Sequence, residues 1–272
     1  MSQFVGKTII ITGASQGVGA AVAKAFAAQK AKLVLIARTK DVLESFGATL
    51  IEKTEVMTFA MNVGDMKACS EMIDTVVKKW GRIDYLINNA GYHQRGPVTT
   101  NEPEDLARMV DINLRAPIAL TRMVLPFIQK NGNGAIVNVG SLAGLTPLQG
   151  AATYAATKAG LRSFTYALHD ELRATGIHVG LVSPGPINTG FIMADMDQVE
   201  DIVFSQPMSS AEEVSDAILL VASGERLEIA MPRISGWLST LSYLIPWLRR
   251  MARPLLYRKG KRLKERYRRA RS

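Results

Sequence analysis

A tyrosine and a lysine lie four residues apart in the segment Tyr154-Ala155-Ala156-Thr157-Lys158. In a helix, this spacing places both side chains on one face. A phenol with an ordinary pKa of about 10 is a weak acid–base catalyst at neutral pH, but a nearby cation stabilises the phenolate and lowers that pKa. Taken alone, such a pair is typical of an ordinary helix surface, so its meaning depends on the residues around it.

Ser141 ends the apolar run that precedes this helix, where a strand is expected over residues 134–141. Its hydroxyl can donate a hydrogen bond to the same substrate oxygen that would exchange a proton with Tyr154. The sequence therefore brings together a phenol, an ammonium group and a hydroxyl suited to proton transfer at one oxygen.

The segment Thr12–Gly19 carries glycines at positions 13, 17 and 19, directly after a strand pattern and directly before a helix pattern. Glycines permit a tight turn and let a pyrophosphate approach the helix N-terminus, where free N–H groups favour anions. At the first strand–helix junction of an α/β chain, this pattern predicts a dinucleotide-binding turn. A purely structural turn is the less favoured alternative.

Arg38 follows the second expected strand, where a dinucleotide-binding domain selects its cofactor. An acid at this place binds the ribose 2′-hydroxyl, whereas an arginine accommodates a 2′-phosphate. No acid occurs before Asp41, so NADP(H) is the preferred cofactor, with Arg38 holding the phosphate. NAD(H) stays possible, and a solvated loop arginine is the alternative interpretation of Arg38.

Short apolar runs alternate with segments of helical period along the chain, and this alternation predicts the strands and helices that position these residues. The apolar runs are continuous, which is typical of parallel strands covered on both faces. We expect a single α/β domain with a Rossmann-type, doubly wound parallel sheet and helices on both faces (residues 1–231), followed by a C-terminal helical extension (residues 232–272). The expected strands lie at 7–12, 32–37, 55–60, 84–89, 134–141 and 178–184, and the main helices at 20–29, 66–80, 105–129 and 153–174.

The motifs together resemble the short-chain dehydrogenase/reductase superfamily over residues 5 to about 231. Their order and spacing agree with the family pattern along nearly the whole chain. The residues that carry the resemblance are Thr12, Gly13, Gly17, Gly19, Asn88, Asn89, Ala90, Gly91, Asn113, Ser141, Tyr154, Lys158, Pro184, Gly185 and Thr189.

The resemblance implies hydride transfer between a nicotinamide and a substrate carbon, with Tyr154 exchanging the proton. Lys158 would hold the nicotinamide ribose and lower the pKa of the tyrosine, Ser141 would orient the substrate oxygen, and Asn113 would position a water of the proton relay. The expected cofactor contacts are Gly13, Ser15, Gln16, Gly17, Val18, Gly19, Arg38, Asn62, Val63, Asn89, Ala90, Gly91, Tyr154, Lys158, Pro184, Gly185, Ile187 and Thr189.

Two features depart from the usual family pattern. Asn62-Val63 stands where relatives commonly place an acid that binds the adenine, although an amide can still donate and accept at the ring. The chain also continues past Arg226–Pro232 into a long extension, which resembles those of membrane-associated members that act on lipid-like substrates.

Substrate contacts are expected from Ser141, Tyr154, His93 and Phe191. His93 lies in the loop after Gly91, where a residue at the rim of the cleft is the plainer interpretation. Phe191 belongs to residues 187–210, which the sequence predicts to be a substrate lid. The alternative is an ordinary helical connection whose methionines fill core gaps.

The net charge of +9 comes from the C-terminal extension, because residues 232–272 hold 13 of the 33 Lys and Arg residues and a single acid, Glu265. An apolar stripe of helical spacing accompanies this charge and favours a helix lying at a membrane interface. Packing on the body or on a second protomer is the alternative, and nucleic-acid binding is unlikely because the aromatic residues form no stacking platform. The stripe consists of Trp237, Leu241, Leu244, Leu248, Met251 and Leu255.

A single cysteine, Cys69, excludes an internal disulfide, and the N-terminus carries no signal-peptide pattern. We therefore expect a cytoplasmic protein that can sit peripherally at the cytoplasmic membrane face. His93, His169 and His178 form no ligand pattern with Cys69, so no metal is expected.

Three functions stay open at this point. The leading one is an NADPH-dependent reductase of a lipophilic ketone, such as a 3-ketosphinganine-like keto-lipid, a steroid or a retinoid. The alternatives are a 3-oxoacyl-carrier-protein reductase, whose basic tail would bind an acidic carrier, and a non-catalytic dinucleotide sensor. A homo-oligomer is expected, because the family commonly pairs protomers through the helices that carry Asn113 and Tyr154.

Overall fold

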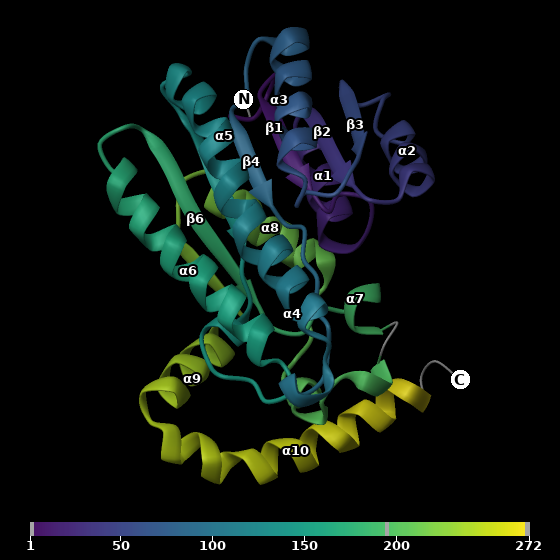
Figure 1. The fold of residues 1–272 in the computed structure, drawn as a ribbon, viewed down its shortest axis with the longest axis vertical. Helices are drawn as coiled ribbons and strands as arrows, with labels where there is room; N and C mark the ends of the chain where they lie inside the picture. Colours follow the sequence, from purple (N-terminus) through teal and green to yellow (C-terminus); the bar gives the residue numbers. More distant parts are fainter. Residues whose placement is uncertain (1–2, 194–195, 270–272) are drawn as a thin grey trace.

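The computed structural model describes residues 3–193 and 196–269, apart from the side chain of Phe191. Its centre is a seven-stranded parallel sheet with the order β3-β2-β1-β4-β5-β6-β7 (Figure 1). This arrangement confirms the Rossmann-type α/β fold and adds a seventh strand near residue 230. The strands are β1 (Thr8–Thr12), β2 (Lys32–Ala37), β3 (Val56–Ala60), β4 (Tyr85–Asn88), β5 (Gly134–Val139), β6 (Ile177–Pro184) and β7 (Glu228–Met231).

Helices cover both faces of the sheet, as the continuous apolar strands require. One face packs against α1 (Gly17–Ala28), α2 (Lys40–Ala48) and α8 (Ala211–Ala222). The other packs against α3 (Met66–Trp80), α5 (Ala116–Lys130) and α6 (Ala152–Leu172). Strand order reverses between β1 and β4, and ligands bind α/β sheets at the carboxyl edge beside such a point.

The long helix expected over residues 105–129 is present as a continuous helical run from Pro103 to Lys130, but the run is not α-helical throughout. Helix α4 (Pro103–Val110) passes through a π-helical turn, Asp111–Arg115, into α5. In the wider turn, Ala116 N–H donates to the carbonyl of Asp111, five residues earlier. Such turns are frequent at functional sites, and this one contains Asn113.

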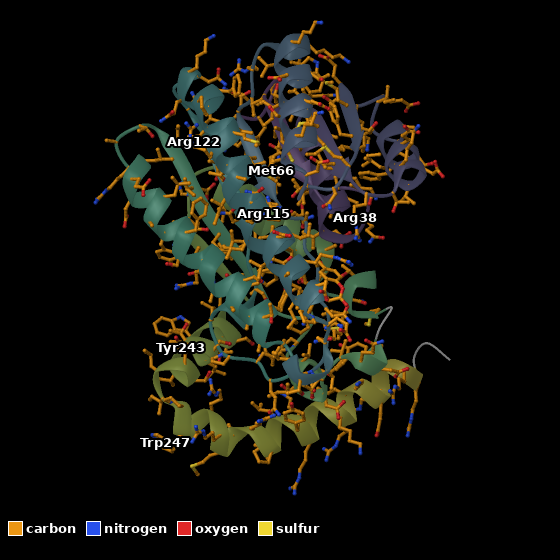
Figure 2. The ribbon with its side chains drawn as sticks, viewed as in Figure 1. Arg38, Met66, Arg115, Arg122, Tyr243 and Trp247 are labelled. Atoms are coloured by element: carbon orange, nitrogen blue, oxygen red, sulfur yellow. The ribbon has the colours of Figure 1, made fainter. Side chains whose placement is uncertain are left out.

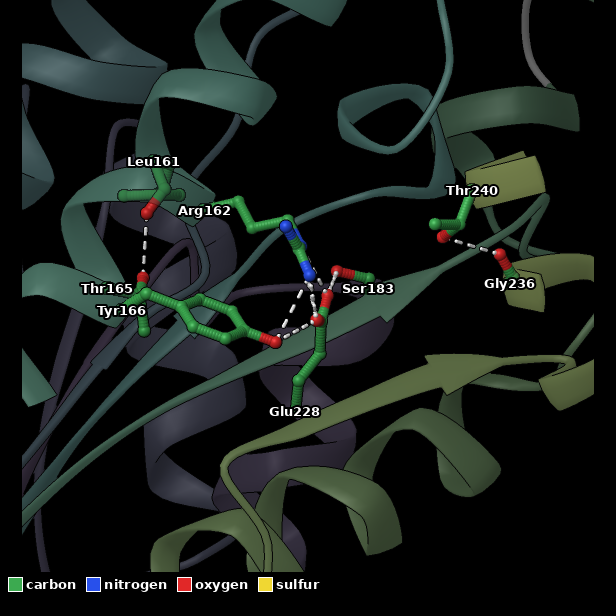
Figure 3. A network of polar contacts seen from close by, with 8 residues as sticks. All are labelled: Leu161, Arg162, Thr165, Tyr166, Ser183, Glu228, Gly236 and Thr240. Carbon is green, nitrogen blue, oxygen red and sulfur yellow. Dashed lines mark hydrogen bonds and ion pairs between the residues drawn. The ribbon is translucent and has the colours of Figure 1, made fainter. Parts of the chain in front are cut away.

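Strand β7 is attached to its neighbours through the carboxylate of Glu228 (Figure 3). This carboxylate accepts hydrogen bonds from Arg162 Nη2 (2.8 Å) and the Tyr166 hydroxyl (2.6 Å), both on α6, and from Ser183 Oγ on β6 (3.0 Å). The ion pair between Arg162 and Glu228 is half-buried and bidentate, so it holds the last strand in register at the base of the C-terminal extension.

The extension forms two helices, α9 (Arg233–Leu244) and α10 (Pro246–Arg269), which pass beneath the carboxyl edge of the sheet (Figure 1). The apolar stripe expected on one helix is therefore divided at Ile245, since Pro246 begins a new helix. Among the described residues, no helix combines the length and apolar character needed to cross a bilayer.

The segment predicted as a lid folds into short helical turns: α7 (Gly190–Met193), Met196–Gln198 and Asp201–Ser205. Ile192, Met196, Val199 and Phe204 form a small apolar cluster there, and Leu263 and Tyr267 of α10 pack against it. The methionine thus fills a local core, as the plainer interpretation expected, while the segment still borders the cavity described below.

Candidate active site

A cavity of about 1200 Å³ opens at the carboxyl edge of the sheet, between the ends of the strands and helices α9 and α10. Of the residues predicted from sequence, Gly19 and Asn113 are absent from its lining, and the Phe191 side chain lies outside the described part of the structure. The predicted residues that line it are Gly13, Ser15, Gln16, Gly17, Val18, Arg38, Asn62, Val63, Asn89, Ala90, Gly91, His93, Ser141, Tyr154, Lys158, Pro184, Gly185, Ile187 and Thr189.

Gly19 shapes the cavity without lining it. A Cβ at this position would lie 2.1 Å from the carbonyl oxygen of Gly13, so only glycine lets α1 pack this closely on the turn. Gly13 itself has a φ of +66°, in the region that favours glycine. Asn89 Nδ2 then donates to the carbonyls of Thr12 (2.9 Å) and Gly13 (3.1 Å), which ties the turn to the end of β4.

The turn suits an anionic dinucleotide. Gln16 caps α1 without a side-chain hydrogen bond, so the first N–H groups of the helix are not capped by that side chain and can bind a pyrophosphate. Arg38 lies exposed at the end of β2 and lines the same cavity (Figure 2). Because no Asp or Glu lines the cavity among the described residues, Arg38 is placed to bind a 2′-phosphate.

Ser141, Tyr154 and Lys158 meet on the inner wall of the cavity. Lys158 is only 4% exposed, and its Nζ donates to the carbonyl of Val139 at the end of β5 (2.8 Å). The same Nζ lies 5.8 Å from the centre of the Tyr154 ring. Ser141, next to the end of that strand, lies near enough to Tyr154 for its side chain to lower the pKa of the phenol. Strand β5 and helix α6 therefore place a hydroxyl, a phenol and an ammonium group around one point.

The electrostatics of this group differ from the sequence-based expectation. Burial raises the pKa of Tyr154, and this effect exceeds the lowering by the nearby Ser141 side chain and by the charge of Arg95, so the net direction is upward. Burial also lowers the pKa of Lys158 to about 8. A raised pKa keeps the phenol protonated at neutral pH, which suits a general acid that donates to a carbonyl oxygen.

Asn113 is completely buried in the π-helical turn, and its side chain binds the main chain of Tyr92. The amide accepts from Tyr92 N–H (2.8 Å) and donates to Tyr92 C=O (2.7 Å). Asn113 thereby fixes the loop that follows β4, which is a positioning role that the sequence did not reveal.

That loop brings His93 onto the ring of Tyr154. The His93 ring stacks on the Tyr154 ring, with 4.1 Å between centroids and 14° between planes. Burial, Arg95 and Lys158 together lower the pKa of His93 to about 3, so the imidazole is neutral and Arg95 Nη1 can donate to its Nδ1 (3.3 Å). His93 thus contacts Tyr154 directly, and Arg95 of the same loop also lines the cavity.

The model of the short chain dehydrogenase family matches residues 7–200. This chain is a short-chain dehydrogenase. It is 34% identical over 229 residues to 3-oxoacyl-[acyl-carrier-protein] reductase FabG of Thermotoga maritima, covering 81% of this chain and 92% of that protein. It is also 34% identical over 227 residues to an NADP-dependent 3-hydroxy acid dehydrogenase of Schizosaccharomyces pombe, covering 80% and 88%.

Among solved structures, a metagenomic short-chain oxidoreductase in complex with NADP shares 28% identity and superposes with a TM-score of 0.72. The match covers 85% of this short-chain dehydrogenase and 98% of that chain. Membership of the family makes the protein an oxidoreductase that acts on CH–OH or C=O groups.

Proposed function

We propose that this short-chain dehydrogenase is an NADPH-dependent reductase of ketones in lipophilic molecules. The observation that carries the proposal is the position of Ser141, Tyr154 and Lys158 at the inner end of a cavity that the C-terminal extension lines with several large apolar side chains. These side chains are Ile234, Leu238, Leu241, Leu248 and Leu256.

The chemistry follows from the roles of these side chains. A reduced nicotinamide cofactor, held by the glycine turn after β1 and by Arg38, would supply a hydride to the carbonyl carbon, while Tyr154 gives its proton to the carbonyl oxygen to complete a secondary alcohol. Ser141 orients that oxygen through its hydroxyl, and the ammonium group of Lys158 stabilises the phenolate that is left. Arg38 supports the choice of NADP(H), as does the resemblance to an NADP-bound structure and to an NADP-dependent dehydrogenase. NAD(H) is the alternative cofactor.

Substrates that fit this description are keto-lipids, including 3-ketosphinganine-like molecules, steroids and retinoids. A 3-oxoacyl-carrier-protein reductase is the second candidate, and the name of the Thermotoga maritima relative together with the basic C-terminal helix favours it. A purely dinucleotide-sensing protein fits less well, because Ser141, Tyr154 and Lys158 all line the cavity.

The test is NADPH oxidation by the purified protein with three ketones: a long-chain keto-lipid in mixed micelles, a short soluble ketone, and a carrier-linked 3-ketoester. A kcat/KM at least tenfold higher for the keto-lipid supports the proposal. Preference for the carrier-linked ester promotes the second candidate instead. In the same assay, Arg38→Glu should raise the KM for NADPH far more than Lys40→Glu, a neighbouring change of equal charge.

We further propose peripheral contact with the cytoplasmic face of a membrane through the outer surface of α9 and α10. Trp237 (82%), Leu244 (71%) and Met251 (71%) are strongly exposed on this surface. Tyr243 and Trp247, near the junction of the two helices, are also exposed (Figure 2). If Trp237→Ser/Trp247→Ser protein and wild type pellet equally with anionic vesicles, this contact is absent.

We also propose that the protein forms a homo-oligomer through the helices around Asn113 and Tyr154, because members of this family commonly do so. Light scattering of the purified protein measures its mass, and a monomer at micromolar concentration would contradict it.

A further inference from the structure

Helix α10 contributes a basic segment to the outer end of the cavity. Arg249, Arg250, Arg253 and Lys259 all line it, on the side opposite the sheet. No carboxylate of the described residues belongs to the same lining. The outer end is therefore strongly positive, although residues 1–231 as a whole carry slightly more acids than bases.

Most of these cations have no protein partner. Within the described part of the chain, Arg249, Arg250 and Lys259 make neither an ion pair nor a hydrogen bond through their side chains. Arg253 Nη2 donates to the Tyr257 hydroxyl (3.3 Å), which in turn donates to Glu200 (3.0 Å). The charge of this group is thus largely uncompensated.

Unpaired cations on one helix repel each other when they lie three or four residues apart, as Arg249 and Arg250 each do relative to Arg253. An anion bound between them relieves this repulsion, and the planar guanidinium groups of Arg249 and Arg250 suit bidentate binding of phosphate or carboxylate oxygens. Arg249 and Arg253 are half-buried, so their attraction for an anion is stronger than that of a cation on an open surface, whereas Arg250 and Lys259 are exposed.

The same end of the cavity is apolar beside the cations, since Leu241, Leu248 and Leu256 line it together with them. A ligand that reaches from Tyr154 to this place would cross apolar walls and end at positive charge. We propose that the α10 end of the cavity is an anion subsite, which binds a phosphate or carboxylate group at the far end of an amphiphilic ketone. The inference rests on the proposed reductase function and narrows its substrate class.

The activity test uses keto fatty acids that differ in the number of carbons between the ketone and the carboxylate, together with their methyl esters. For the best-fitting member, KM for the acid should be at least tenfold lower than for the ester. Arg249→Gln/Arg250→Gln should remove most of this difference. Arg262→Gln/Arg266→Gln removes the same charge from an exposed part of α10 that does not line the cavity, and should preserve the difference.

A second measurement does not depend on turnover. Calorimetry with decyl phosphate, below its critical micelle concentration, should show at least tenfold weaker binding to Arg249→Gln/Arg250→Gln than to wild type or the control, a difference of about 1.4 kcal/mol. Inorganic phosphate should bind more weakly than decyl phosphate, because it lacks the chain. Equal affinities for these two ligands would contradict the proposal that the subsite binds an amphiphilic ligand.

The two measurements separate the two proposals. Turnover of acid and ester with equal KM, or an equal loss of affinity in both double variants, overturns the anion subsite and leaves the reductase intact. Absence of turnover with every ketone, combined with the expected decyl phosphate pattern, overturns the reductase and leaves the subsite.

Discussion

Tyr154 is the side chain on which the proposed proton transfer depends. Replacement by phenylalanine keeps the ring that stacks on His93 but removes the hydroxyl, so the fold and the cavity should persist. We expect kcat to fall by about 10²- to 10⁴-fold, the usual contribution of general acid–base catalysis. Steady-state kinetics measure this loss, and fluorescence titration should show an unchanged Kd for NADPH.

Tyr166→Phe on the same helix is the matched control for this change. Tyr166 binds Glu228 and does not line the cavity, so its removal should affect stability and leave kcat near the wild-type value. A Tyr154→Phe enzyme with the wild-type rate would exclude the phenol as the proton donor.

Lys158 is a buried cation, and its depressed pKa makes a prediction about stability. Since burial lowers its pKa from 10.5 to about 8, the unfolded chain binds more protons than the folded chain between these values. The free energy of unfolding therefore rises as the pH increases from about 8 to 10.5, and the whole contribution of this group is about 3 kcal/mol. Below pH 8 the burial cost is fully present.

Lys158→Met cannot titrate at this position and should lack the rise. Urea unfolding at pH 7, 8, 9 and 10 should show the wild type gaining stability relative to the variant as pH increases. Lys130→Met, at an exposed position, is the control for loss of one positive charge. A wild-type-minus-variant difference that stays constant from pH 7 to 10 would contradict the buried, depressed ammonium group.

At the scale of elements, the features that could be predicted from the sequence are those that depend on a few neighbouring residues. Continuous apolar strands, the glycine turn and the Tyr154–Lys158 spacing each lie within a few residues, and the structure contains all three. The break between α9 and α10 could also have been predicted locally, because Pro246 interrupts a helix, but the continuous apolar spacing favoured a single helix.

Contacts between distant segments had no such signal. The bonds from Asn113 to the main chain of Tyr92, and the stacking of His93 on Tyr154, depend on a π-helical turn that no periodicity announces. The attachment of α10 to residues 196–205 could not be predicted from local pattern either, because its partners lie about 65 positions apart in the chain.

Lys264 is the centre of that attachment. It is 7% exposed, and its Nζ donates to the carbonyl of Val199 (2.6 Å) and pairs with Asp201 (3.2 Å). Lys264→Ala leaves a buried carbonyl without a donor, at a cost of about 1 to 3 kcal/mol. We expect amide exchange in residues 196–205 to accelerate by tenfold or more, while exchange in the central strands is unchanged.

Because this segment borders the cavity, the same variant should raise KM for a long-chain ketone more than for a short one. Lys261→Ala removes an exposed lysine of the same helix and serves as the control. Exchange that accelerates equally across the whole sheet would show a general loss of stability, and would remove the case for α10 as the support of this segment.

For the whole molecule, the excess of positive charge belongs to the C-terminal extension, which also carries many of the exposed apolar side chains. Attraction of such a surface to anionic lipid is screened by salt, since the screening length falls from about 10 Å at 0.1 M to about 3 Å at 1 M. The rate with a ketone embedded in anionic vesicles should therefore fall several-fold over this range.

The rate with a short soluble ketone is the internal control, because its reduction does not require the protein to reach a lipid surface. Zwitterionic vesicles carrying the same keto-lipid supply the second control, and their rate should depend little on salt. If the vesicle-bound and soluble ketones respond to salt alike, the basic extension does not bring the catalytic domain to the membrane, and the exposed apolar residues of α9 and α10 must have another partner.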